Sequence, residues 1–147
     1  MGLSSKTSLR VRYAETDQMG VVYHSNYLIW FEVGRSELFR EFNLPYTLFE
    51  EQGIGLAVVE ANCRYRKATH YDDELVIATK IENISPRTVV FSYSVYHQEA
   101  LMAEGKTKHV FINENGRSTD VRGYAIWPRL QALIENQKNT VDCFKEI

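Results

Sequence analysis

Residues 26–42, NYLIWFEVGRSELFREF, predict one helix that is buried on most of its circumference. Apolar positions recur at spacings of three and four residues, at Tyr27, Phe31, Gly34, Leu38 and Phe42. In the first half Leu28, Ile29, Trp30 and Val33 widen this stripe almost to a full circle. We therefore expect the helix at the centre of the fold. Glycine in mid-helix costs about 1 kcal/mol against alanine, so Gly34 predicts a close approach by a packed neighbour.

Strands flank this helix on both sides in the sequence. Before it, Leu9, Val11 and Tyr13 alternate with Arg10 and Arg12, which predicts a strand with one buried face. After it, apolar positions recur every second residue in four segments: Val59, Ala61, Cys63 and Tyr65; Leu75, Ile77 and Ile81; Val89, Phe91, Tyr93 and Val95; Ala103, Gly105, Thr107, His109 and Phe111. The short connections between these segments predict an antiparallel four-strand meander.

The order strand, long buried helix and four strands predicts an α+β fold. We expect a curved antiparallel sheet of about five strands wrapped around the helix. A short last helix is expected to begin near Trp127-Pro128. The 147 residues fit a single domain, residues 1–147, with a core at about 7–130. Open edge strands predict pairing with a second copy of the chain.

The composition excludes several classes of function. The formal net charge is −2, from 17 basic and 19 acidic residues, so no strong field favours nucleic acid or an anionic membrane surface. No apolar run approaches the roughly 18 residues of a membrane span, and the N-terminus lacks the apolar core of a signal peptide. Cys63 and Cys143 have no metal-ligand spacing, and we expect two reduced thiols, with a single disulfide between them as the alternative. We therefore expect a cytoplasmic protein.

The turn before the central helix, residues 15–20, contains a candidate catalytic carboxylate, Asp17. A helix N-terminus offers unpaired backbone N–H groups and a partial positive charge, which stabilise an oxyanion on a substrate carbonyl. A carboxylate in the preceding turn can act as a base that activates water, or as a nucleophile that forms a mixed anhydride. Asp17 and the helix N-terminus together would suit acyl transfer. Aspartate is also a common turn residue, and spacing alone favours that simpler role.

Residues 13–27, YAETDQMGVVYHSNY, resemble the signature of the hot-dog thioesterases, in the 4-hydroxybenzoyl-CoA thioesterase-like family. The family pattern is an aspartate, a glycine three residues later, a short apolar stretch and Asn-Tyr at the start of the central helix. Asp17, Gly20, Asn26 and Tyr27 match it. The resemblance implies the hot-dog fold and hydrolysis of an acyl-CoA thioester to CoA and a free acid, with no separate cofactor. It also implies a homodimer or homotetramer with active sites at the dimer interface.

The resemblance also implies roles for individual residues near the turn. Asp17 would be the catalytic carboxylate, and Gly20 would allow the tight turn that aims it. The backbone N–H of His24 would polarise the thioester carbonyl. The His24 side chain would position water or orient Asp17, or it is simply a histidine at a helix start. Tyr23 and Asn26 are expected to line the substrate pocket.

Basic residues are expected at the mouth of the groove because CoA carries phosphates. By resemblance, Arg87 is a phosphate contact and Arg117 is a second candidate. Arg64, Arg66 and Lys67 form another basic cluster. That cluster fits either a solvated strand face or a recognition surface for an acidic carrier protein.

Other functions on the same fold stay open. An acyl-carrier-protein thioesterase would use the basic cluster, and a non-catalytic acyl-CoA binding module would bind ligand without turnover. A hot-dog dehydratase pairs a catalytic histidine with an acid, often near a proline-rich stretch that the Asp17 turn lacks. No GxSxG serine motif is present, and the four histidines show no metal-ligand spacing, so no metal is expected.

Overall fold

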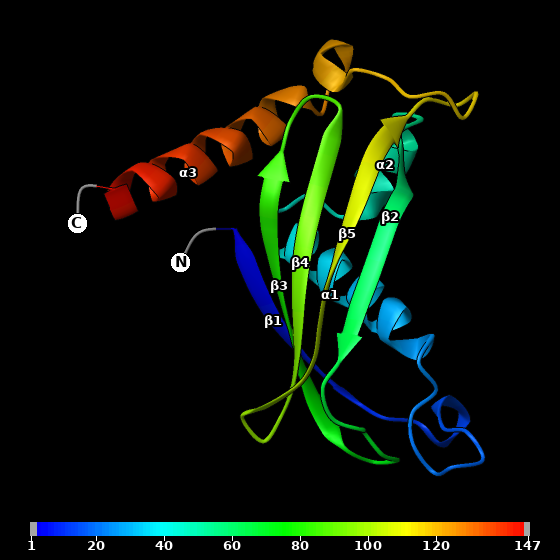
Figure 1. The fold of residues 1–147 in the computed structure, drawn as a ribbon. Coiled ribbons are helices and arrows are strands. Elements are labelled where there is room, and N and C mark those ends of the chain that lie inside the picture. Colours follow the sequence, from blue (N-terminus) through cyan, green and yellow to red (C-terminus); the bar gives the residue numbers. More distant parts are fainter. Residues whose placement is uncertain (1–2, 146–147) are drawn as a thin grey trace.

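The computed structural model describes the backbone of residues 3–145 and the side chains of residues 3–136, so the Cys143 side chain lies outside the described part. Its elements are β1 (Ser4–Arg10), a 3₁₀ turn (Tyr13–Glu15), α1 (Asn26–Glu41), α2 (Tyr46–Glu51), β2 (Gly55–Tyr65), β3 (Glu74–Ile84), β4 (Thr88–His97), β5 (Ala100–Ile112), a second 3₁₀ turn (Val121–Gly123) and α3 (Trp127–Lys145). One five-stranded antiparallel sheet lies against α1 (Figure 1). The predicted α+β class is therefore confirmed.

The strand order is β1-β3-β4-β5-β2. The predicted meander is correct for β3, β4 and β5 but wrong for β2, which pairs with β5 and lies three strand positions from β3. Three spacings amount to roughly 14 Å, which the link at residues 66–73 can span because an extended residue covers about 3.3 Å. A short link therefore did not make β2 and β3 neighbours.

The central helix α1 begins and ends within one residue of the predicted bounds. The close approach expected at Gly34 is confirmed, because a Cβ there would lie 2.2 Å from Thr79 Oγ1 and 3.0 Å from Ile77 Cγ2. The expected burial nearly all round is wrong for the single chain, since Leu28, Ile29 and Val33 are exposed. The sheet covers one side of α1 and leaves these side chains uncovered.

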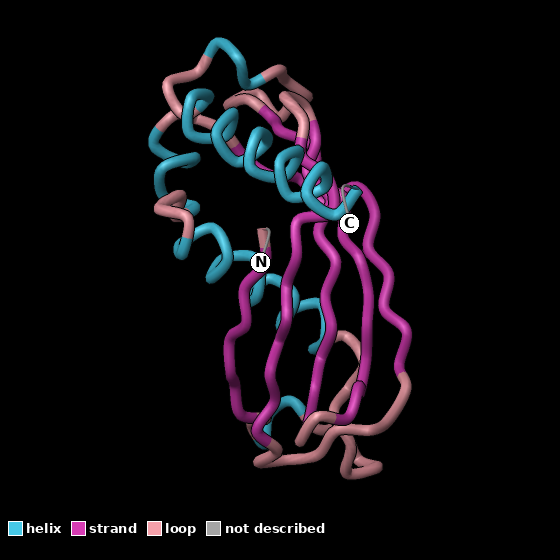
Figure 2. Tube along the Cα trace, turned by 90° about the vertical axis from the view of Figure 1, so that its left-hand side faces the viewer, coloured by secondary structure: helices cyan, strands magenta, loops and turns pink. Residues whose placement is uncertain are grey.

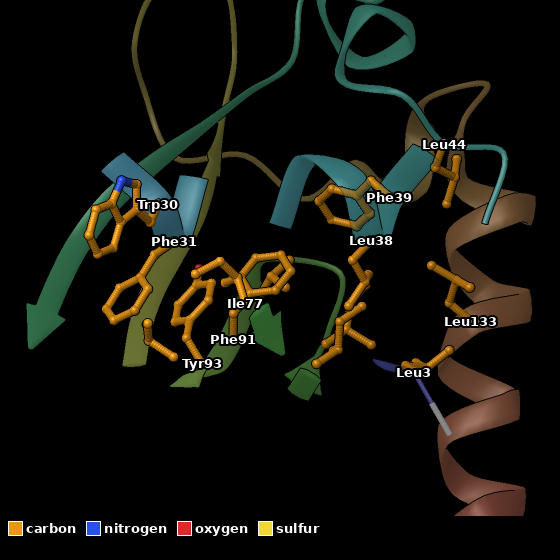
Figure 3. Packing of buried hydrophobic residues seen from close by; sticks show 14 of the residues in the cluster. Leu3, Trp30, Phe31, Leu38, Phe39, Leu44, Ile77, Phe91, Tyr93 and Leu133 are labelled. Carbon is orange, nitrogen blue, oxygen red and sulfur yellow. The ribbon is translucent and has the colours of Figure 1, made fainter. Parts of the chain in front are cut away.

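The core lies between α1 and the concave face of the sheet (Figure 3). Phe31 of α1 stacks on Tyr93 with ring centroids 4.2 Å apart, and Phe39 meets Phe91 edge-on at 5.5 Å. The predicted inward residues of β3 and β4 are all buried: Leu75, Ile77, Ile81, Val89, Phe91, Tyr93 and Val95. Leu133 of α3 packs beside Leu3 at the far end of this core.

The two edge strands differ from their predictions. β1 ends at Arg10, and Tyr13, which was predicted to face inward, lies in the 3₁₀ turn and is 76% exposed. In β2 the predicted alternation fails because a β-bulge lies between Val58 and Glu60 and the strand is at the edge of the sheet. Val58 and Val59 are 49% and 50% exposed as a result.

Different connections gather at the two ends of the sheet (Figures 1 and 2). One end carries the loop between β1 and α1, the link at residues 66–73 and the N-terminus of α1. The other end carries the β3–β4 turn, the turn after β5 and the start of α3. Within the described residues no helix is long and apolar enough to cross a membrane.

Candidate active site

The Asp17 turn is a short, closed loop. Thr16 and Val22 form an antiparallel bridge at its base, and Asp17 N donates to Val21 O at 2.9 Å. Gly20 N donates to Asp17 O at 3.0 Å, and Met19 N donates to the Asp17 carboxylate at 2.8 Å. Gly20 has a φ of +82° and open space around it. Glycine is therefore suited to this position by its backbone conformation and not by crowding.

The N-terminus of α1 presents a free donor beside this turn. Asn26 N donates to Tyr23 O at 3.0 Å and Tyr27 N donates to His24 O at 3.3 Å, which closes the first turn of the helix. The backbone N–H of His24 has no acceptor among the described residues. Free N–H groups and the positive end of the helix dipole suit this position to an anionic oxygen.

A groove of about 310 Å³ brings the turn and the helix N-terminus together. Its lining residues are Asp17, Met19, Val21, Val22, His24, Tyr27, Tyr65, Arg66, Lys67 and Ala68. Of the predicted site residues, the groove contains Asp17 and His24. Arg66 and Lys67, whose role the sequence left open, also lie on its wall.

The second wall of the groove is formed by the end of β2 and the first residues of the link that follows it, Tyr65, Arg66, Lys67 and Ala68. Val22 N donates to Thr69 O at 2.9 Å, and the Tyr27 hydroxyl meets Thr69 Oγ1 at 2.6 Å in the interior. Tyr65, at the end of β2, donates its hydroxyl proton to His24 O at 3.0 Å. These contacts fix the link and the start of α1 against each other. Tyr65 and Thr69 were not predicted as part of the site.

Glu15 is a second carboxylate of the turn, and it was missed by the sequence reasoning. Its side chain is buried and accepts hydrogen bonds from Trp30 Nε1 and from Arg12 N, both at 2.8 Å. Burial raises the pKa of Glu15, but the hydrogen bonds from Arg12 and Trp30 outweigh it and hold the pKa below its ordinary value of 4.5. Its backbone O accepts from Tyr23 N and from Asn26 Nδ2, each at 2.9 Å. Glu15 therefore ties the turn to α1.

The other predicted site residues lie outside the groove in the single chain. Tyr23 is exposed, with its ring 4.4 Å from the His24 ring, and the Asn26 amide is bonded to Glu15 O. Arg87 and Arg117 lie in turns at the opposite end of the sheet from Asp17. One chain thus brings together the carboxylate and the helix donor but not the two arginines. No group of three or more metal-ligating side chains occurs in the described part of the chain.

A five-stranded antiparallel sheet packed against one long helix is also found in a solved relative. The DHNA-CoA thioesterase from Staphylococcus aureus superposes with a TM-score of 0.86 at 31% identity, over 93% of this chain and 94% of that chain. The hot-dog fold expected from the sequence is therefore confirmed.

Sequence comparison gives the same family. A model of the thioesterase-like superfamily matches residues 11–137. The Bacillus subtilis protein YneP is 39% identical over 111 residues, which cover 75% of this chain and 80% of YneP. The acyl-CoA thioesterase YbgC of Haemophilus influenzae is 33% identical over 101 residues, which cover 68% of this chain and 74% of YbgC. The chain belongs to the thioesterase-like superfamily, and the predicted class of enzyme, a thioester hydrolase, is confirmed.

Proposed function

We propose that this protein hydrolyses acyl-CoA thioesters to CoA and a carboxylic acid, with Asp17 as its catalytic carboxylate. The observation that carries the proposal is the groove shared by the Asp17 side chain and His24, whose backbone N–H has no acceptor among the described residues. Membership of the thioesterase-like superfamily supports it, as do relatives named for acyl-CoA and DHNA-CoA thioesters.

The two groups divide the chemistry between them. The His24 N–H and the positive end of α1 would stabilise the oxyanion that forms when the thioester carbonyl is attacked. As a general base, Asp17 would take a proton from water, whose hydroxyl adds to the carbonyl before the C–S bond breaks and the CoA thiolate leaves. As a nucleophile, Asp17 would form a mixed anhydride that water then hydrolyses. Both routes use the same turn and the same donor.

A carrier-protein thioester is the second candidate substrate. Arg66 and Lys67 line the groove, and Lys67 has no ion-pair partner in the part of the chain that the structure describes. Arg66 is paired with Glu104. Such cations would attract the acidic surface of an acyl carrier protein as well as the phosphates of CoA.

The same proposal includes a dimer built through β2. This edge strand exposes Val58 and Val59, whereas β1, the other edge, exposes serine, lysine and arginine side chains. Antiparallel pairing of two β2 strands about a two-fold axis reverses the partner sheet. Gly55, at the start of β2, pairs with Ile112 at the end of β5, so this end of β2 lies beside the turns that carry Arg87 and Arg117. In the reversed partner sheet, those turns would approach the Asp17 end of the first chain. That arrangement would complete a CoA-binding surface from two chains.

The dimer is tested by placing a charge on the edge strand. Val59→Asp sets two carboxylates near each other across the two-fold axis and should reduce the mass seen in sedimentation to that of one chain. Ser8→Asp, on the exposed edge β1, should leave the mass unchanged. A wild-type protein that sediments as a single chain and hydrolyses acyl-CoA at full rate would contradict the shared site.

The activity is tested by thiol release from short, long and aromatic acyl-CoAs and from an acyl carrier protein. Asp17→Asn keeps the shape of the side chain and its bond to Met19 N. It should lower kcat about 10²-fold or more, because a positioned general base contributes about 10²–10⁴-fold. Equal turnover by both proteins would mean that Asp17 only shapes the turn. Tight binding of acyl-CoA without turnover by the wild type would indicate a binding module.

A further inference from the structure

Tyr65 stands at the end of β2 and faces the start of α1 across the groove. We propose that Tyr65 is a positioning residue, whose hydroxyl holds the His24 carbonyl so that the His24 backbone N–H faces the substrate. The inference rests on the proposed function, because it assigns the device that fixes its oxyanion donor. The contact that carries it is the hydrogen bond from the Tyr65 hydroxyl to His24 O at 3.0 Å.

His24 is anchored on both sides of its N–H group. On the preceding residue, Tyr23 N donates to Glu15 O at 2.9 Å and Tyr23 O accepts from Asn26 N at 3.0 Å. A trans peptide directs its C=O and N–H in opposite directions. Since Tyr23 O faces the first turn of α1, the His24 N–H of the same peptide faces away from the helix. The following carbonyl oxygen, His24 O, accepts from Tyr27 N at 3.3 Å, and the Tyr65 hydroxyl adds a shorter second anchor at 3.0 Å.

The Tyr65 ring is itself held in place. It meets the Tyr27 ring edge-on, with centroids 5.0 Å apart and an interplanar angle of 84°. Tyr27 is buried and bonded to Thr69, and its ring lies 4.6 Å from the Trp30 ring. Removing the Tyr65 hydroxyl therefore leaves a phenyl ring with its packing intact. The variant Tyr65→Phe removes the hydroxyl bond to His24 O and leaves the backbone bond from Tyr27 N to that oxygen in place.

The hydroxyl remains a donor over the working pH range. Burial raises the pKa of Tyr65 to about 12, and the neighbouring Cys63 adds to the rise. A carbonyl oxygen can only accept, so a neutral hydroxyl is the form that the contact requires. The bond also joins the end of the edge strand β2 to the start of α1, through two residues that are 41 positions apart in the sequence.

The test is the split between kcat and KM in Tyr65→Phe. Loss of one oxyanion donor lowers kcat about 10²–10³-fold. In Tyr65→Phe the donor is still present but less well aimed, so kcat should fall about 10-fold. KM should stay nearly unchanged. Tyr71→Phe is the matched control, since Tyr71 is also exposed and lies outside the groove. A change confined to KM would mean that Tyr65 touches substrate, and an unchanged kcat would overturn the proposal.

A second readout needs no activity. Amide nitrogen–proton spectra of the free protein should show shifts at His24 and Ser25 in Tyr65→Phe but not in Tyr71→Phe. If the wild type hydrolyses none of the thioesters, the proposed function fails while these shifts still decide whether Tyr65 fixes the His24 backbone. Unshifted His24 and Ser25 signals would overturn the positioning role.

Discussion

The turn before α1 carries two carboxylates. The first is enclosed by the protein, and the second is open to the groove. In the first half, the Glu15 carboxylate is buried, accepts hydrogen bonds from Arg12 N and Trp30 Nε1, and has a lowered pKa. In the second half, Asp17 is half-buried, accepts from Met19 N and opens onto the groove. A carboxylate whose acceptor sites are occupied by the protein has little capacity left for a substrate. The difference indicates that Glu15 builds the turn and that Asp17 is available for chemistry.

The largest effect on folding is expected from replacing Glu15, the buried carboxylate in the first half of the turn. Glu15→Gln keeps the size of the side chain but turns one oxygen into an amide donor that faces a donor, either Arg12 N or Trp30 Nε1. Leaving a buried donor without an acceptor costs about 2 kcal/mol. The free energy of unfolding in urea should fall by about that amount. An unchanged value would mean that the turn does not depend on Glu15.

The free energy of unfolding should also depend on pH through Glu15. The pKa of Glu15 is lower in the folded protein than its ordinary value of 4.5, so its stabilising contribution is complete above that value. The contribution is lost as the pH falls below 4.5 towards the folded pKa. Urea unfolding of the wild type and Glu15→Gln should therefore differ most at neutral pH and converge in acid. A difference that grows in acid would contradict the assignment.

A smaller effect is expected in the second half of the turn. Gly20 has a φ of +82° and Gly116, in the turn after β5, has a φ of +75°, both with open space around them. Alanine at either position should cost about 1 kcal/mol, because a left-handed conformation is strained for a residue with a Cβ. Only Gly20→Ala should also lower kcat, since only that turn aims Asp17. Equal kcat in both variants would mean that the activity does not depend on the backbone conformation of the Asp17 turn.

The sequence predicted elements whose pattern is local. The spacing of Tyr27, Phe31 and Leu38 was enough for α1, and Gly34 was enough for its close contact with the sheet. The position of β2 was not predictable in the same way, because strand order depends on which edge is free and a link of eight residues reaches several strands. The Asp17 turn was found because a family pattern contains it.

The remaining site residues left little trace in the sequence. Glu15 is a glutamate in a polar turn, and nothing around it in the sequence signals burial, which arises from Trp30 on the helix that follows. Tyr65 and His24 meet only because the end of β2 lies beside the start of α1. Contacts between distant segments of this kind follow from the tertiary arrangement and not from the spacing of residues.

Under the proposed function, Glu15 is the structural carboxylate of the turn and Asp17 is the chemical one. The most direct test of this division is to measure both urea unfolding and acyl-CoA turnover for Glu15→Gln and Asp17→Asn beside the wild type. We predict that Asp17→Asn unfolds like the wild type and loses turnover. Glu15→Gln should lose about 2 kcal/mol of stability and keep most of its turnover in the folded fraction. The reverse pattern, with an unstable Asp17→Asn and an inactive but stable Glu15→Gln, would contradict the account.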